Sequence, residues 1–396
     1  MPTARSTQHD RRVSALASAA LLSASLVCAL TLGCASKSSD SPKAAALNLP
    51  AGGYVPDRRY QTISTKDLWT VGGNSVDVSL LVPAPPGVYP LVLYLPGLGQ
   101  SPDAGLPWRQ SWAQAGYAVL CVQPTQFGSA IWTSRRAHAG DFSGIAKEAF
   151  SAPSASMRTQ VVRDTLEQLS RRQRDARVAA FAQIDLARIA VAGFDLGAQT
   201  ALIVAGASLR GVEPLNFPDT VKAAIVLNPY AGTSATESNL QPTRLPVLAV
   251  TSALDTDASG LLSSSQIRRA QFQSLPPGQK YLLLLASAPH AVVGGASPFG
   301  AGEGRNTSDE PTAEDDKILG DETAEVEEGR RKKRRRIDYS LSRADKLAQS
   351  ARVQAQVQAV TTAYLDAIVR SDAAAAAWLT KNARQWLGDS AELITK

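Results

Sequence analysis

The chain has 396 residues, 44% of them hydrophobic, and a formal net charge of +6 at pH 7. This length and hydrophobic content are sufficient for one large α/β core or two smaller ones. The net charge is modest and unevenly distributed, and no glycine-rich phosphate loop or dinucleotide fingerprint is present. The sequence therefore gives no reason to expect a nucleic-acid partner or an organic cofactor.

The first 34 residues have the pattern of a secretion signal, because Arg11-Arg12 precede an apolar stretch from Val13 to Gly33. The stretch ends in Leu30-Thr31-Leu32-Gly33-Cys34, which resembles a bacterial lipobox, although Thr31 replaces the usual Leu or Val. The resemblance implies that Cys34 is lipidated and becomes the first mature residue. The alternative is an uncleaved signal anchor, since the stretch is long enough to span a bilayer.

Residues 35–58 are rich in Ser, Ala, Pro and Gly, as expected for a flexible tether. Ala35 stands where Asp would indicate inner-membrane retention, so the lipoprotein resemblance implies outer-membrane sorting within the bacterial cell envelope. After processing, Cys121 would be the one remaining free thiol, which excludes an internal disulfide. It lies in an apolar run typical of a buried strand, and we expect it to fill the core.

From residue 59 to residue 298, apolar strand-like runs alternate with helical stretches. Leu68 to Val82 predicts an antiparallel hairpin that turns at Gly72-Gly73-Asn74, and residues 158–180 predict a helix. Alternation of this kind implies right-handed crossovers and a mostly parallel central sheet flanked by helices, which is the α/β class. Ligands of such sheets bind beyond the carboxyl ends of the strands. Further strands are expected at 90–95, 117–122, 188–192, 221–227, 246–251 and 281–286.

Residues 299–348 are expected to form a charged, disordered insertion, because apolar residues are scarce there. Acidic residues dominate from Glu303 to Glu328, and a basic run covers Arg330 to Arg336. A solvated loop whose two halves attract each other is one interpretation, and contact with anionic lipid headgroups or surface polysaccharide is another. No folded recognition motif accompanies the basic run, so nucleic acid is not an expected partner.

Helical patterns return near Ala348 to Arg370 and from Ala373 to Leu379. We expect residues 349–396 to complete the domain that residues 59–298 begin.

The most informative motif is Gly193-Phe194-Asp195-Leu196-Gly197, which follows the strand 189–192 and precedes the helix 198–204. Strand, G-x-S-x-G turn and helix form a nucleophile elbow, and here Asp195 takes the place of the central Ser. The two glycines allow the turn to be sharp. A carboxylate at this position can attack an alkyl carbon and form an ester, whereas attack on an acyl carbon would give a reactive anhydride.

Two further residues follow later strands in the order nucleophile, acid, histidine. Asp255 follows the strand 246–251, and His290 follows the strand 281–286. His290 would take a proton from water or from the nucleophile, while Asp255 fixes its tautomer. Asp257 is an alternative orienting acid, and a histidine with a purely structural role is the alternative for His290.

An oxyanion hole requires two backbone N–H groups. Leu196, directly after the elbow Asp, would supply one of them. Leu98 in the loop Pro96-Gly97-Leu98-Gly99 would supply the other, because this loop follows the strand 90–95. A plain tight turn is the alternative for this loop, since it also explains the glycines.

Together these residues resemble the α/β-hydrolase superfamily, and within it the dienelactone-hydrolase-like enzymes, including the platelet-activating-factor acetylhydrolase and chlorophyllase groups. The resemblance covers about residues 60–298 and 349–380. It also rests on an early helical Arg and Asp, a closing helix and a final Trp-Leu pair, here Arg158, Asp164, Val360 to Ala367 and Trp378-Leu379. It implies an α/β-hydrolase fold.

The sequence departs from these families in several places. Pro96 stands where a His is common, and the Asp at the elbow is similar to that of haloalkane dehalogenases and epoxide hydrolases. Those enzymes usually have Trp where this chain has Leu196. They also carry a helical cap, and the interval from Asn228 to Leu245 is too short for one, so no large cap domain is expected. The aromatic-rich loop from Gln123 to Ser156 would form either a small lid or a packed surface loop.

The sequence therefore predicts a lipid-anchored envelope hydrolase that acts on a small ester or alkyl electrophile, with Asp195 as nucleophile or as general base. The alternative is a non-catalytic binding lipoprotein on a degenerate hydrolase scaffold. The expected partners are a small-molecule substrate and, through Cys34, the membrane. No metal site is expected, because one cysteine and two well-separated histidines remain after processing. The oligomeric state stays open.

Overall fold

A computed structural model describes residues 51–174, 179–230, 232, 238–255, 261–262, 264–297 and 342–396. The chain divides into two units, Met1–Ala44 and Ala45–Lys396, and all described residues belong to the second. The expected signal peptide, Cys34, Asp257 and most of the expected tether and charged insertion lie outside the described residues.

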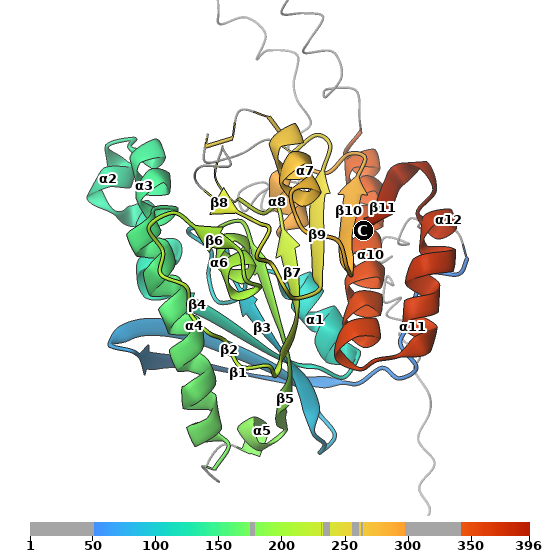
Figure 1. The fold of residues 1–396 in the computed structure, drawn as a ribbon, viewed down its shortest axis with the longest axis horizontal. Helices are drawn as coiled ribbons and strands as arrows, with labels where there is room; N and C mark the ends of the chain where they lie inside the picture. The colour runs from blue at the N-terminus through green and yellow to red at the C-terminus, as the bar shows by residue number, and fades with distance from the viewer. Residues whose placement is uncertain are drawn as a thin grey trace, which may run out of the picture. The chain divides into compact units, whose positions relative to one another are not determined.

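A nine-stranded, largely parallel sheet forms the centre of the second unit (Figure 1), with the strand order β1-β2-β4-β3-β5-β7-β9-β10-β11. The pairs from β4 across to β10 are all parallel, whereas β1, β2 and β11 pair antiparallel with their neighbours. The short strands β6 and β8 form a separate pair. The strands are β1 Thr62–Val71, β2 Asn74–Pro83, β3 Tyr89–Leu95, β4 Ala118–Pro124, β5 Ile184–Phe194, β6 Ser208–Leu209, β7 Val221–Leu227, β8 Ser238–Asn239, β9 Val247–Ser252, β10 Lys280–Leu285 and β11 Ala391–Thr395.

Helices cover both faces of the sheet. The longer ones are α1, α4, α6 and α10, and the remaining helices connect them to the strands (Figure 1). The mixed α/β class with a mostly parallel, helix-flanked sheet is therefore confirmed. The helices are α1 Leu106–Gln114, α2 Arg135–His138, α3 Phe142–Ala149, α4 Ala152–Arg172, α5 Ala179–Ala182, α6 Leu196–Val204, α7 Gln266–Gln273, α8 His290–Val293, α10 Arg343–Val369, α11 Ala373–Ala377 and α12 Ala383–Leu387.

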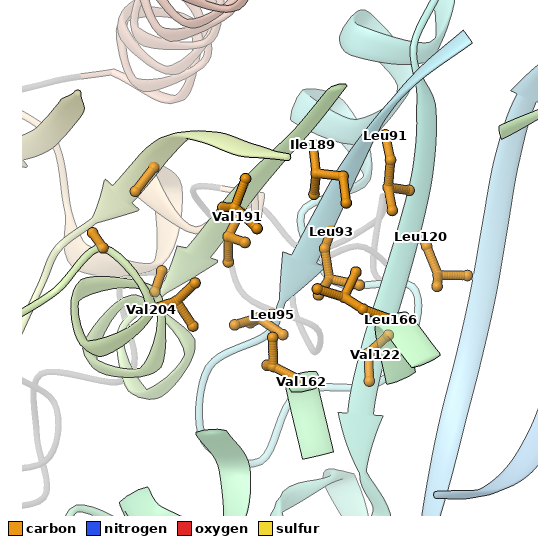
Figure 2. Packing of buried hydrophobic residues seen from close by; sticks show 14 of the residues in the cluster. Leu91, Leu93, Leu95, Leu120, Val122, Val162, Leu166, Ile189, Val191 and Val204 are labelled. Carbon is orange, nitrogen blue, oxygen red and sulfur yellow. The ribbon is translucent and has the colours of Figure 1, made fainter. Parts of the chain in front are cut away.

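The core has two halves because successive strand side chains point to opposite faces of the sheet. Leu91, Leu93 and Leu95 of β3 pack with side chains of α4, among them Val162 and Leu166, as Figure 2 shows. The alternate residues Val92 and Tyr94 pack with α1 and α10 on the other face. Each fully buried aliphatic side chain contributes about 1.5–3 kcal/mol. Among the described residues Cys121 is a free, buried cysteine, so this packing carries no disulfide there.

The predicted hairpin is confirmed, and its turn follows the expected chemistry. Val71 pairs directly with Asn74, which leaves Gly72 and Gly73 as a two-residue turn with φ of 54° and 81°. Positive φ at both central positions is the conformation that favours glycine in such hairpins.

Several elements differ from the expectation, and the helix expected over 158–180 ends at Arg172. Helix α4 begins at Ala152 instead of residue 158, because Pro153 fits the first turn of a helix. Helix α10 begins at Arg343, before the expected end of the insertion, because Ser342 and Asp345 form a capping box. Strand β11 was not predicted and pairs with β10.

The tether was expected to reach residue 58, but the chain makes specific contacts from Gly52 onward. Trp378 donates a hydrogen bond from Nε1 to the Gly52 carbonyl at 2.9 Å, and the Tyr54 hydroxyl donates to Asp366 at 2.8 Å. The segment before β1 is thus attached to the C-terminal helices.

The loop from Gln123 to Ser156 contains α2 and α3, and its aromatic residues divide into two groups. Phe127 and Phe150 are buried, whereas Trp132 and Phe142 are 43% and 55% exposed. The buried pair belongs to the same apolar cluster as Leu196. Part of this loop therefore packs beside the elbow.

Within the described residues, no helix is both long and apolar enough to cross a membrane.

Candidate active site

Asp195 occupies the sharp turn between β5 and α6 in a strained backbone conformation, with φ of 51° and ψ of −109°. Such a conformation is costly for a residue with a side chain and persists only where the surroundings enforce it. The two flanking glycines explain how the turn is possible. A Cβ on Gly197 would lie 1.9 Å from the Leu95 carbonyl oxygen, and one on Gly193 would lie 2.3 Å from the Gly197 backbone.

The structure brings Asp195, His290 and Asp255 together at the carboxyl edge of the sheet. Asp255 follows β9, and His290 begins α8 after β10. The Nδ1 atom of His290 lies 2.8 Å from Oδ1 of Asp255, within hydrogen-bond distance. The Nε2 atom lies 4.0 Å from Oδ1 of Asp195, which is too long for a direct hydrogen bond.

Two side chains that the sequence analysis missed hold Asp255 in place. Arg268 of α7 forms a buried ion pair with Oδ2, and both side chains are almost fully inaccessible. Asn228, directly after β7, donates to Oδ1 at 3.1 Å and lies 3.0 Å from Nδ1 of His290. Asn228 is buried and has φ of 46°, a conformation that Asn tolerates better than most residues. The place of Asn228 at the end of a predicted strand was a usable signal, whereas nothing in the sequence marks Arg268.

The loops that carry the acid and the histidine are joined to each other. The Ser252 hydroxyl accepts hydrogen bonds from the backbone N–H groups of Ala288 at 2.9 Å and Leu254 at 3.2 Å. The imidazole ring also packs on Phe194, with ring centroids 4.9 Å apart. These contacts fix the position of His290 relative to the elbow.

The loop with Leu98 lies directly against the elbow, since a Cβ on Gly97 would come within 3.3 Å of the Asp195 Cβ. Buried Gln123 holds this loop by donating hydrogen bonds to the carbonyls of Gly97, Gln100 and Phe127. Among the described residues, neither the Leu98 N–H nor the Leu196 N–H has a hydrogen-bond acceptor. An oxyanion hole formed by these two N–H groups would require both to be free of other acceptors.

The surroundings of the elbow are apolar and largely closed. The side chains of Asp195 and His290 are 9% and 12% exposed. Phe127, Phe150 and Leu196 form a buried cluster against which Leu98 and Tyr230 pack. The described residues around the elbow thus offer a carboxylate and an imidazole beside an apolar wall.

A buried cation lies behind the elbow on α4. Arg158 is 5% exposed and donates hydrogen bonds to Thr200, to Gln199 and to the Ala149 carbonyl. Burial lowers the pKa of Arg158 to about 9, while the charge of Asp195 opposes this shift. The guanidinium therefore stays charged at neutral pH.

Nothing in the described part of the chain groups three His, Cys, Asp or Glu side chains in a way that could hold a metal ion. No protein-family model matches the chain, and no curated protein matches it either.

Proposed function

We propose that this chain is a hydrolase of the α/β-hydrolase type that uses Asp195 as a carboxylate nucleophile on a small alkyl electrophile. The observation that carries the proposal is the position of the His290 imidazole between two carboxylates, with Nδ1 on Asp255 and Nε2 facing Asp195. The strand order, and the places of the three residues after β5, β9 and β10, support the hydrolase-type fold that the sequence resembles.

In the first step, a carboxylate oxygen of Asp195 attacks the substrate carbon. A new C–O bond forms as the bond to the leaving group breaks, and the leaving group departs with the electron pair. A halide leaves as the anion, and an opened epoxide leaves its oxygen as an alkoxide that takes up a proton from solvent water. The result is an alkyl ester of Asp195.

In the second step, Nε2 of His290 takes a proton from water, and the hydroxide adds to the ester carbonyl carbon of Asp195. The N–H groups of Leu98 and Leu196 stabilise the oxyanion that forms. The C–O bond to the alcohol then breaks, and the alcohol takes the proton from the imidazolium. Asp195 is left as the carboxylic acid, and it releases its proton to solvent to restore the carboxylate. The 4.0 Å separation supports this role, because Nε2 is not engaged by the carboxylate itself.

An uncharged substrate fits the surroundings better than an anionic one, because the elbow presents a carboxylate beside an apolar wall. An ester substrate would require a different mechanism, in which Asp195 acts as general base on water.

We further propose that Cys34 is lipidated and anchors the enzyme in the bacterial cell envelope at the outer membrane. The sequence pattern of residues 1–35 supports this location.

The test is a hydrolysis screen of the full-length chain in mild detergent against haloalkanes, epoxides and short nitrophenyl esters. Turnover that is abolished by Asp195→Ala is the expected result, and the responsive substrate class separates alkyl from acyl chemistry. A His290→Gln variant should accumulate one alkyl group on Asp195, detected as a mass increase by peptide mass spectrometry. Absence of turnover, or turnover that survives Asp195→Ala, would instead favour a binding lipoprotein on a degenerate scaffold.

A further inference from the structure

The buried Arg158 guanidinium has hydrogen bonds but no carboxylate in contact. Its acceptors are the Thr200 hydroxyl at 2.9 Å, the Gln199 side-chain oxygen and the Ala149 carbonyl, all of which are neutral. Within the described residues, no Asp or Glu forms an ion pair with it. Neutral acceptors satisfy its N–H groups, and a nearby carboxylate lowers the cost of burying its charge further.

The elbow carboxylate is the charge that favours the charged form of Arg158. Gln199 and Thr200 lie in the first turns of α6, which begins immediately after Asp195, and the Gln199 N–H donates to the Asp195 carbonyl at 3.1 Å. Arg158 thus lies against the first turns of α6, since its hydrogen bonds go to Gln199, to Thr200 and to the end of α3.

We propose that Arg158 is a positioning residue that holds Asp195 as the anion at the elbow. The proposal rests on the proposed function and names the group that maintains its nucleophile. It implies that the Asp at this elbow is one half of a buried charge pair, so that a neutral residue in its place would leave the guanidinium without compensation.

A second buried arginine lies beside the other carboxylate of the candidate site, because Arg268 forms a buried ion pair with Asp255.

A double-mutant cycle on the full-length chain tests the coupling without any assay of activity. The variants are Arg158→Met, Asp195→Asn and the double variant, and the measurement is the melting temperature at neutral pH in mild detergent. Contacting or electrostatically paired residues give non-additive changes, whereas distant residues give additive ones. We expect Asp195→Asn to lower the melting temperature by several degrees more in the wild-type chain than in the Arg158→Met chain.

Arg109 supplies the matched control. It is also fully buried and also donates only to neutral acceptors, which are the Pro102, Ala104 and Ser79 carbonyls and the Ser79 hydroxyl. It lies on α1 and packs beside Tyr94, on the opposite face of the sheet from Arg158. A cycle of Arg109→Met with Asp195→Asn should be additive. Equal additivity in the Arg158 cycle would overturn the proposal. Should Arg158→Met fail to fold, Arg158→Gln takes its place.

The pH dependence of kcat/KM distinguishes an electrostatic role of Arg158 from a purely structural one, which would leave the pH profile unchanged. With Arg158→Met, the acid limb of kcat/KM should shift to higher pH, and Arg158→Lys should restore much of the original limb. An unchanged limb in both variants would contradict the proposal. If the wild type shows no turnover but the Arg158 cycle is coupled, the hydrolase proposal fails and the charge pair stands.

Discussion

The Nδ1 atom of His290 lies 2.8 Å from Oδ1 of Asp255, and this contact is shielded from water because the Asp255 side chain is fully buried. Two further groups hold the carboxylate, since Asn228 also donates to Oδ1 and Arg268 pairs with Oδ2. Such a carboxylate fixes the orientation of the ring and the proton on Nδ1, and it leaves Nε2 as the basic atom toward the elbow.

Removal of the Asn228 amide should reduce activity more than stability. Asn228→Gly keeps a residue that accepts φ of 46° while deleting the donor to Asp255. We expect kcat/KM to fall by about tenfold or more, equivalent to about 1.4 kcal/mol of barrier. Steady-state kinetics beside a denaturant titration checks this. A variant with wild-type kcat/KM would show that the amide does not position the histidine.

Loss of the arginine behind the acid should be strongly destabilising. Arg268→Met removes the partner of a fully buried carboxylate and should cost about 3–5 kcal/mol of unfolding free energy. The double variant Arg268→Met, Asp255→Asn should recover part of that loss, because no unpaired buried charge remains. Chemical denaturation of the three variants measures both values, and a double variant less stable than Arg268→Met alone would refute the explanation.

The elbow glycine should not tolerate a methyl group. Gly197→Ala would place Cβ 1.9 Å from the Leu95 carbonyl oxygen and should destabilise the fold by about 3 kcal/mol or more. Gly128→Ala is the control, since its Cβ would come no nearer than 3.2 Å to backbone and its φ of −79° suits alanine. Similar unfolding midpoints for the two variants would contradict the steric argument.

The stability of the folded chain should depend on pH through Asp366, the carboxylate that binds the N-terminal segment through Tyr54. Burial raises the pKa of this carboxyl, against the opposing hydrogen bonds of Tyr117, Tyr54 and Arg370. A folded-state pKa above the unfolded value means that the folded chain binds the proton more tightly. The contribution to stability is therefore present at low pH and is lost as the pH rises through the raised pKa.

Asp366→Asn removes this titration. The stability of the Asn variant relative to the wild type should therefore improve as the pH rises from about 4 toward neutral. Denaturant unfolding at several pH values measures the difference. A relative stability that moves in the opposite direction would show that the hydrogen bonds outweigh burial.

Cys121 should be inert in the folded chain. Its thiol is fully buried in β4, and burial raises its pKa to about 11, so little thiolate exists at neutral pH. A disulfide exchange reagent should label it only after denaturant is added. Rapid labelling of the native chain would show that β4 opens readily.

The sequence was sufficient to predict the sheet and the order of the reacting groups, because strands and sharp turns leave local signals. The two glycines around Asp195 have no room for a side chain, and Asp255 and His290 follow strands whose carboxyl ends share one edge. The three side chains lie near one another because β5, β7, β9 and β10 are neighbouring parallel strands.

Other features depend on contacts between distant segments. Arg268 meets Asp255 only because α7 folds back beside β9, and no local pattern distinguishes it from other helical arginines. Strand β11 forms because β10 offers an open edge, which a short C-terminal run does not reveal by itself. The start of α10, in contrast, had a readable signal in the spacing of Ser342 and Asp345.

The nature of the elbow carboxylate is tested most directly by single turnover in H₂¹⁸O with excess enzyme and a substrate identified by the screen. If Asp195 forms an ester that water cleaves at its carbonyl carbon, one ¹⁸O atom enters the Asp195 side chain, and the first product molecule carries none. Peptide mass spectrometry detects the label, and His290→Gln should suppress it. Label that appears in the product of the first turnover, with none in Asp195, would show that water attacks the substrate directly and would contradict the nucleophilic role of Asp195.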